Sequence, residues 1–172
     1  IKAYAAMSKG NPLELFEYES SLLNSNEVNI KVLSCGICHS DISAIDDSWG
    51  KSKYPMVAGH EVIGEIIEIG SNVSLHKIGD RVGLGWHSGY CNDCEQCNAG
   101  DHNFCNSTKK TVFSQHGGFA EQVTADEVSV IPIPSGLNHA DAGPLLCGGI
   151  TVFTPIVEFN INKNHNVGII GI

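Results

Sequence analysis

Four cysteines lie close together near the middle of the sequence, and they constrain the fold more than any other feature. They are Cys91, Cys94, Cys97 and Cys105, with gaps of two, two and seven residues. Gaps of two residues let successive thiolates face one ion, and the longer gap brings the fourth ligand back to complete a tetrahedron. Because a closed four-cysteine site leaves no position for a substrate, we expect a structural zinc that stabilises a lobe at about residues 88–108.

Disulfides and an iron–sulfur cluster are the alternatives for these four cysteines. The first residues show neither a basic leader nor a long apolar stretch, so no secretory signal is expected. We therefore expect a cytoplasmic, reducing setting, in which disulfides are rare. A ferredoxin-type cluster has different cysteine spacing. Zinc is the favoured interpretation.

The composition argues against several functional classes. The chain has 19 acidic and 10 basic side chains, a formal charge of −9 with its histidines neutral. This balance argues against a nucleic-acid or anionic-membrane partner, both of which select basic patches. Apolar residues make up 42% of the 172 residues, enough for a real core. No apolar run approaches the roughly 18 residues of a membrane-spanning helix.

A second group of possible ligands is scattered along the chain. Cys38 begins a short polar motif, His60 precedes Glu61, and Cys147 lies among small and apolar residues, where a thiol usually packs in a core. Two thiolates and one imidazole would make a zinc site that keeps a fourth position open. Ligands so far apart cannot be paired from spacing alone, so separate structural roles remain an alternative. Cys35 is a lower-ranked competitor as a ligand.

The first two-thirds of the chain has the pattern of short strands separated by turns. Val28, Ile30 and Val32 alternate with polar residues, the mark of a strand with one buried face. The expected strands are 28–32, 62–69, 81–84 (after a Gly79-Asp80 turn), 119–123 and 128–131. Short strands with frequent glycine turns predict a mainly β fold with a partly open barrel, not a parallel sheet.

The composition changes near Gly148. Apolar residues recur at helical spacing over 150–157, with Pro155 inside the stretch predicting a kink. The segment Val167–Ile172 is typical of a buried parallel strand that runs into a glycine turn. A dinucleotide-binding unit would continue with further glycines, a helix and a residue that selects the ribose.

Five motifs occur in a fixed order along the chain: Cys35–Asp41, Gly59–Gly64, Cys91–Cys105, Gly117–Glu121 and Pro144–Gly149. In this order the sequence resembles the N-terminal catalytic domain of the zinc-dependent medium-chain alcohol dehydrogenases, in the cinnamyl-alcohol-dehydrogenase-like aldehyde reductase branch. The resemblance implies a GroES-like, partly open β-barrel with short helices over residues 1–148. It also implies that residues 149–172 are the first helix and strand of a truncated Rossmann domain.

The resemblance implies a second, catalytic zinc. Its ligands would be Cys38, His60 and Cys147, with Glu61 as the nearby carboxylate that takes the fourth position when substrate or water is absent. Asp41 matches the carboxylate that accepts from the far ring nitrogen of His60 and so fixes its tautomer.

Other residues receive roles from the same resemblance. Ser40 matches the hydroxyl that passes a proton to or from the reacting oxygen. The remaining matches are His39 near the cofactor pyrophosphate, Thr151 near the nicotinamide, Gly171 as the first glycine of the phosphate-binding loop, and Trp49 and Trp86 in the substrate-pocket wall. Many relatives have a histidine at the position of Ser43, so here the proton relay ends in water, in the cofactor ribose or at His39.

The function implied by the resemblance is the zinc-dependent interconversion of primary alcohols and aldehydes with a nicotinamide cofactor, with aldehyde reduction favoured. Two zinc ions per chain, NADP in preference to NAD, a small-molecule substrate and a homo-oligomeric full-length form are expected. The 172-residue chain alone is expected to be inactive, because the cofactor domain is missing from it.

Two other classes remain as alternatives. One is a metal-dependent interaction module without catalysis, built on the four-cysteine lobe. The other is a reductase of the same fold without a catalytic zinc, as in quinone reductases, although Cys38, His60 and Cys147 are all present. The other histidines are expected at the surface, with His87, which follows Trp86, as the favoured exception.

Overall fold

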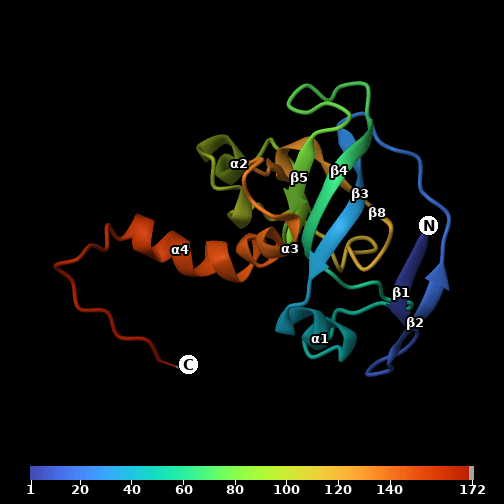
Figure 1. Cartoon of the computed structure of the whole chain (residues 1–172), viewed down its shortest axis with the longest axis horizontal. Helices are drawn as coiled ribbons and strands as arrows, with labels where there is room; N and C mark the ends of the chain where they lie inside the picture. The colour runs from blue at the N-terminus through green and yellow to red at the C-terminus, as the bar shows by residue number, and fades with distance from the viewer. Residues whose placement is uncertain (171–172) are drawn as a thin grey trace.

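The chain folds around a five-stranded antiparallel sheet (Figure 1). The computed structural model describes residues 1–170. The strands are β3 (Glu27–Gly36), β4 (Glu61–Ile69), β5 (Arg81–Leu84), β8 (Gln122–Asp126) and β9 (Val130–Pro132), in the order β8-β3-β4-β5-β9. Every neighbouring pair in this sheet is antiparallel. The expected mainly β architecture is thereby confirmed.

Two small sheets and several short helices surround this sheet. The pairs are β1 (Lys2–Ala6) with β2 (Leu13–Glu17), and β6 (His87–Gly89) with β7 (Lys109–Lys110). The α-helices are α1 (His39–Ile45), α2 (Glu95–Ala99), α3 (His139–Ala142) and α4 (Gly148–Glu158). Three 3-10 turns span His102–Phe104, Glu127–Ser129 and Gly143–Leu146. The helices are too short to form a layer, so the sheet supplies the rigid frame.

The main core lies on one face of the five-stranded sheet. Val28 and Ile30 of β3 are fully buried, as their alternation predicts. The core members are Val28, Ile30, Val62, Ile66, Val82, Leu84, Val123, Ala125 and Val130. Strands β3 and β4 make the longest pairing in the sheet. Strand β3 ends just before Cys38, and β4 begins directly after His60.

Two of the expected strands have different boundaries. The strand expected at 119–123 begins only at Gln122, because residues 119–121 pair with β1 through an isolated bridge between Ala3 and Ala120. The strand expected at 128–131 begins at Val130, because Glu127–Ser129 forms a 3-10 turn. The expected strands at 28–32, 62–69 and 81–84 are confirmed, with Gly79 in the left-handed region (φ +89°) before β5.

The C-terminal part leaves the sheet (Figure 1). The helix predicted over 150–157 is confirmed as α4, with Pro155 inside it. The buried strand predicted at Val167–Ile172 is not formed over 167–170, where Ile169 is 72% exposed. A parallel strand needs a neighbour for its backbone hydrogen bonds, and none lies beside this segment within residues 1–170. Gly171 lies outside the described residues.

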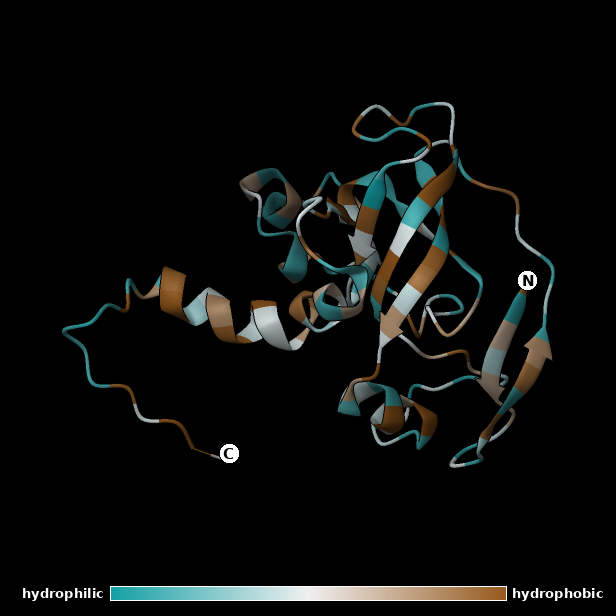
Figure 2. Ribbon diagram, in the orientation of Figure 1, coloured by the Kyte–Doolittle hydropathy of each residue, from teal (hydrophilic) through white to brown (hydrophobic). Residues whose placement is uncertain are grey.

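Helix α4 carries apolar side chains but buries none of them. Figure 2 shows its hydrophobic residues as brown bands along the ribbon. Among residues 1–170 no single helix is long and apolar enough to cross a membrane. The segments His139–Leu146 and Gly148–Glu158, bent by 57° to each other, reach that length and apolarity only together.

Candidate metal centres

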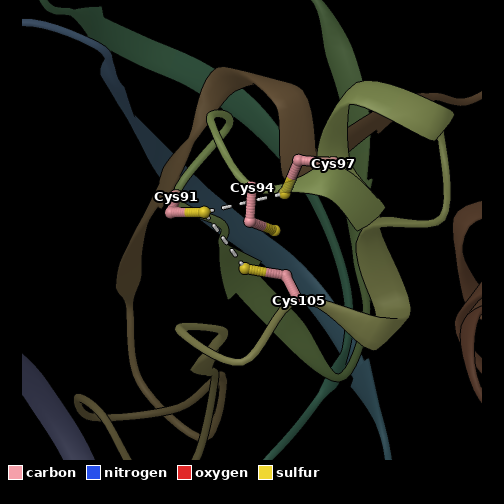
Figure 3. Close-up of side chains that lie close together, drawn as sticks. All are labelled: Cys91, Cys94, Cys97 and Cys105. Carbon is pink, nitrogen blue, oxygen red and sulfur yellow. Dashed lines mark hydrogen bonds between the residues drawn. The ribbon is translucent and has the colours of Figure 1, made fainter.

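The four clustered cysteines turn their thiols toward one point (Figure 3). The Sγ atoms of Cys91, Cys94, Cys97 and Cys105 all lie within 4.8 Å of one another. The Cys91–Cys97 sulfur distance is 3.9 Å and the Cys91–Cys105 distance is 3.4 Å. A disulfide needs about 2.05 Å, whereas zinc–sulfur bonds of about 2.3 Å in a tetrahedron place the sulfurs roughly 3.8 Å apart. The four thiols therefore fit a zinc ion.

Local backbone structure brings the four thiols together. Cys94 is the N-cap of α2, whose single turn carries Cys97, and Gly100 ends that helix in the left-handed region (φ +89°). A 3-10 turn then leads to Cys105. Within 91–105 only Cys97 and Cys105 are buried. Since the lobe has almost no apolar core, a metal is the interaction that would hold it.

The thiols of the lobe differ in proton affinity. Backbone hydrogen bonds, first from Asp93, lower the pKa of Cys91 to about 6, whereas burial raises the pKa of Cys97 to about 12. A cation at their centre would favour the thiolate form of all four.

A second group of ligand atoms converges from distant parts of the sequence. One ligand atom each from Cys38, His60, Glu61 and Cys147 lies within 4.8 Å of the others. The Sγ atoms of Cys38 and Cys147 are 3.8 Å apart, and His60 Nε2 is 3.3 Å from Cys147 Sγ. Sequence spacing alone could not predict that these four residues lie together, and the fold brings them together.

Each ligand of this second group lies at the end of an element. Cys38 follows β3 and precedes α1, and His60 and Glu61 lie at the start of β4. Cys147 lies between the 3-10 turn Gly143–Leu146 and α4. The four ligands lie on three segments of the chain. Gly36 and Glu61 are directly paired across β3 and β4, so these two strands hold the segments that carry Cys38 and His60 next to each other.

Asp41 fixes the orientation of His60. Its Oδ1 is 2.8 Å from His60 Nδ1 and also accepts from the Gly59 backbone N–H, and its Oδ2 accepts from the Cys38 N–H at 3.0 Å. Asp41 and His60 are both buried. Burial lowers the pKa of His60, but the hydrogen bond and charge of Asp41 outweigh it, so this pKa is raised. With its proton on Nδ1, His60 presents Nε2 to the two thiols.

The two thiols and the carboxylate of the second group lie so close together that the negative charge of one disfavours ionisation of the others. Burial raises the pKa of Cys38, but the hydrogen bonds from Ser40 and Cys147 and the charge of His60 together outweigh it, so this pKa falls below its usual range. Burial, followed by the neighbouring Cys38, raises the pKa of Cys147 to about 11. Burial also raises the pKa of Glu61. Two sulfurs, an imidazole and an oxygen form a donor set that suits zinc, and a dication would relieve this repulsion.

Helix α1 begins inside the ligand motif and was not predicted from the sequence. Cys38 is its N-cap, and its thiol accepts from the Ser40 N–H at 3.5 Å, while the Asp41 carboxylate accepts from the Cys38 N–H. This is a capping box with cysteine in the usual serine position. The spacing of a polar residue three positions before an acidic one was the available signal.

The remaining expected site residues are placed as follows. Ser40 lies in the first turn of α1, half-buried beside Cys38, whereas His39 on α1 and Thr151 on α4 are exposed. No ligand group among residues 1–170 includes Cys35 or His87. Burial raises the pKa of the Cys35 thiol to about 12.

An aromatic cavity lies beside the second group. The Trp86 ring meets the His60 ring edge-on, with centroids 4.8 Å apart. Trp49 and Phe113 pack against Trp86 and against each other, with centroids 5.9–6.0 Å apart. The cavity measures about 330 Å³ and is lined by Trp49, Lys51, Trp86, Lys110 and Phe113. Both expected tryptophans line it, whereas Phe113 gave no signal in the sequence.

Comparisons with known proteins agree with this geometry. Residues 24–135 match the alcohol dehydrogenase GroES-like domain. The whole chain is 49% identical over 172 residues to the aldehyde reductase AdhA of Synechocystis sp. and covers 51% of it. It is 40% identical to a probable cinnamyl alcohol dehydrogenase of Eucalyptus globulus, with 98% of this chain and 50% of that protein covered.

Solved structures show the same likeness. A cinnamyl alcohol dehydrogenase from Sorghum bicolor has a TM-score of 0.89 and 33% identity, covering 94% of this chain and 48% of its own. The CAD from Helicobacter pylori complexed with NADP(H) also has a TM-score of 0.89, with 32% identity, 94% of this chain and 49% of its own. This chain thus spans about half the length of the curated relatives it matches. On the motif order, the fold and the matched residues, the chain belongs to the alcohol dehydrogenase family that carries the GroES-like domain.

Proposed function

We propose that this chain supplies the metal-binding catalytic half of an oxidoreductase that interconverts primary alcohols and aldehydes with a nicotinamide cofactor, mainly in the direction of aldehyde reduction. One observation carries the proposal. Cys38, His60 and Cys147 converge beside an aromatic cavity, with His60 held in a single orientation by the buried Asp41. A module built only for interaction would need the closed four-cysteine lobe but not this second, differently composed group.

We assign metal-binding roles to the residues of the second group and an orienting role to Asp41. Cys38, His60 and Cys147 would hold a zinc ion, and Glu61 would occupy or leave the fourth position. When bound, zinc acts as a Lewis acid toward the substrate oxygen, and the nicotinamide carries the hydride. Asp41 keeps the proton on Nδ1 of His60.

Ser40 is our choice for the residue that moves the proton. It is half-buried in the first turn of α1, next to Cys38, so its hydroxyl is near the group that would meet the substrate oxygen. Ser43 lies one turn further along α1, where it replaces the outer histidine of many relatives. The proton then continues to water, to the cofactor ribose or to His39.

The wider assignments rest on the relatives. We propose two zinc ions per chain, one in each group. NADP is our choice of cofactor because a structurally similar CAD is complexed with NADP(H), and His39, Thr151 and Gly171 would contact it. A homo-oligomeric full-length form is also proposed.

A chimera tests this function. The second half of the Synechocystis aldehyde reductase, which this chain does not cover, is fused after residue 172. We expect the chimera to oxidise NADPH with benzaldehyde and the 172-residue chain to show no turnover. Cys147→Ser should abolish the activity, and Cys35→Ala should retain it. A chimera that folds and holds two zinc ions but does not reduce the aldehyde would contradict the proposal.

A further inference from the structure

The residues that line the aromatic cavity beside the second metal group carry positive charge, whereas the chain as a whole is acidic. Its five lining residues include two lysines, Lys51 and Lys110, and no acidic residue. The chain as a whole has 19 acidic and only 10 basic side chains. Two of those 10 cations therefore gather at one small cavity of an acidic protein, so the charge of the lining residues is opposite in sign to the net charge.

Both lysines lie close to the tryptophans that line the cavity. Gly50, in the left-handed region (φ +65°), separates Trp49 from Lys51. Lys110 of β7 pairs with His87, which directly follows Trp86, and the next residue, Thr111, donates its backbone N–H to the Trp86 carbonyl. Lys51 thus follows one of the two tryptophans closely in sequence, and Lys110 lies on the strand paired beside the other, and both line the cavity.

Neither ammonium is neutralised by a neighbour. Within residues 1–170, the ion pairs involve only His60 with Asp41, and Lys109 with Glu27 and Asp126. Asp47 is close in sequence to Lys51, but its Oδ1 accepts from the Ser52 N–H at 2.9 Å and it does not line the cavity. Lys51 and Lys110 are therefore available to an anionic ligand.

We infer that the cavity selects aromatic aldehydes that carry a carboxylate on the far side of the ring from the aldehyde group. This inference rests on the proposed function and names its substrate class. The aldehyde would face Cys38, His60 and Cys147, since Trp86 contacts His60. The ring would lie against Trp49, Trp86 and Phe113, and the carboxylate would meet Lys51 and Lys110.

Size and chemistry support a substrate with one ring. The volume of about 330 Å³ is near the lower end of the roughly 300–1,000 Å³ that ligand sites span. Edge-on aromatic walls favour a flat ring. Ammonium–carboxylate pairs at a partly exposed site contribute modestly and are screened by salt. The lysines therefore determine preference between similar substrates rather than total affinity.

The tryptophans provide the measurement. The chain contains two tryptophans, and both line this cavity, so quenching of intrinsic fluorescence reports binding there. The zinc-loaded chain is titrated with 4-formylbenzoate and with the matched neutral probe 4-formylbenzamide. We expect the carboxylate to bind roughly 3- to 10-fold more tightly at low salt, with the preference falling as salt is added.

Lysine variants decide whether the preference arises in the cavity. Lys51→Gln/Lys110→Gln should bind the two probes equally, with the affinity for the amide unchanged. The control Lys53→Gln/Lys77→Gln removes the same charge from two exposed lysines that do not line this cavity, and should keep the preference.

Three results would overturn the inference. They are equal binding of both probes by the unchanged chain, a preference that survives in Lys51→Gln/Lys110→Gln, and no quenching by either probe. A preference that survives in the lysine variant but disappears without zinc would show that the carboxylate binds the metal instead. Zinc content is measured separately in the same samples, so an absent second zinc would count against the proposed function alone.

Discussion

At the scale of single residues, Asp41 connects the two parts of the second metal group. Its carboxylate accepts from His60 Nδ1 and from the backbone N–H groups of Gly59 and Cys38. The bonds to Gly59 and His60 join the segment that carries Cys38 to the segment that carries His60, and the bond to Cys38 holds the first of these segments in shape. The role of Asp41 toward His60 was predicted from the family resemblance. Its bond to the Cys38 N–H follows the spacing of a capping box, whereas its bond to the Gly59 N–H depends on how the two segments pack.

Replacing Asp41 tests this role. Asp41→Asn keeps the size of the side chain but removes its charge and lets the amide face His60 with a donor. We expect the affinity for the second zinc to fall about 10- to 100-fold, because a ligating histidine loses its orienting carboxylate. Competition with a chromophoric chelator measures this. Asp46→Asn, at the exposed end of the same helix, is the control, and equal affinity in the two variants would contradict the account.

Tyr18 provides a residue-scale test of stability against pH. Burial raises its pKa to about 12, above the value of about 10 for a free tyrosine. Between these two pH values the folded chain binds more protons than the unfolded chain, so the free energy of unfolding falls as the pH rises. Below about pH 10 this contribution is fully present.

The test compares urea unfolding near pH 9 and near pH 11. We expect the unchanged chain to lose more stability over this interval than Tyr18→Phe, which has no phenol to ionise. Tyr4→Phe alters an exposed tyrosine and should follow the unchanged chain. Parallel losses in the unchanged chain and Tyr18→Phe would show that burial does not control the ionisation of Tyr18.

At the scale of elements, strands with regular alternation were predicted well and short helices were not. The apolar alternation predicted β3, although Asn29 between Val28 and Ile30 is buried as well, and β4 buries both of its faces over its first four residues. Helices α1, α2 and α3 have seven, five and four residues, too few for a helical period to be recognised. The four-cysteine lobe was predicted from spacing alone, because all its ligands lie in one short segment.

The lobe should therefore depend on its metal. Cys97→Ser removes one ligand, and we expect zinc content to fall from two ions to one per chain. Proteases should then cut within 91–105, because little apolar burial holds that segment, while the five-stranded sheet remains folded. Limited proteolysis with mass spectrometry locates the cuts. Cys35→Ala, at a half-buried cysteine outside both groups, should keep two zinc ions. A resistant lobe in Cys97→Ser would be contrary to expectation.

At the scale of the whole molecule, the fold brings together Cys38, His60 and Cys147, whose pairing could not be predicted from spacing. Cys38 and Cys147 are 109 residues apart in sequence. The packing of α3 and of the 3-10 turn Gly143–Leu146 against β3 and β4 brings them together. The family resemblance predicted this pairing; periodicity and spacing did not. The helical pattern predicted α4 but not the exposure of its apolar side chains, because amphipathic spacing does not say what an element packs against.

The central claim is that the chain builds two zinc sites, and zinc content with thiol titration tests it most directly. Six of the seven cysteines are assigned as ligands, and the seventh, Cys35, is half-buried. The account predicts two zinc ions per chain by elemental analysis, with Cys38 and Cys147 protected from alkylation until a chelator is added. One zinc ion per chain, with the four-cysteine lobe protected and Cys38 alkylated at once, would contradict it.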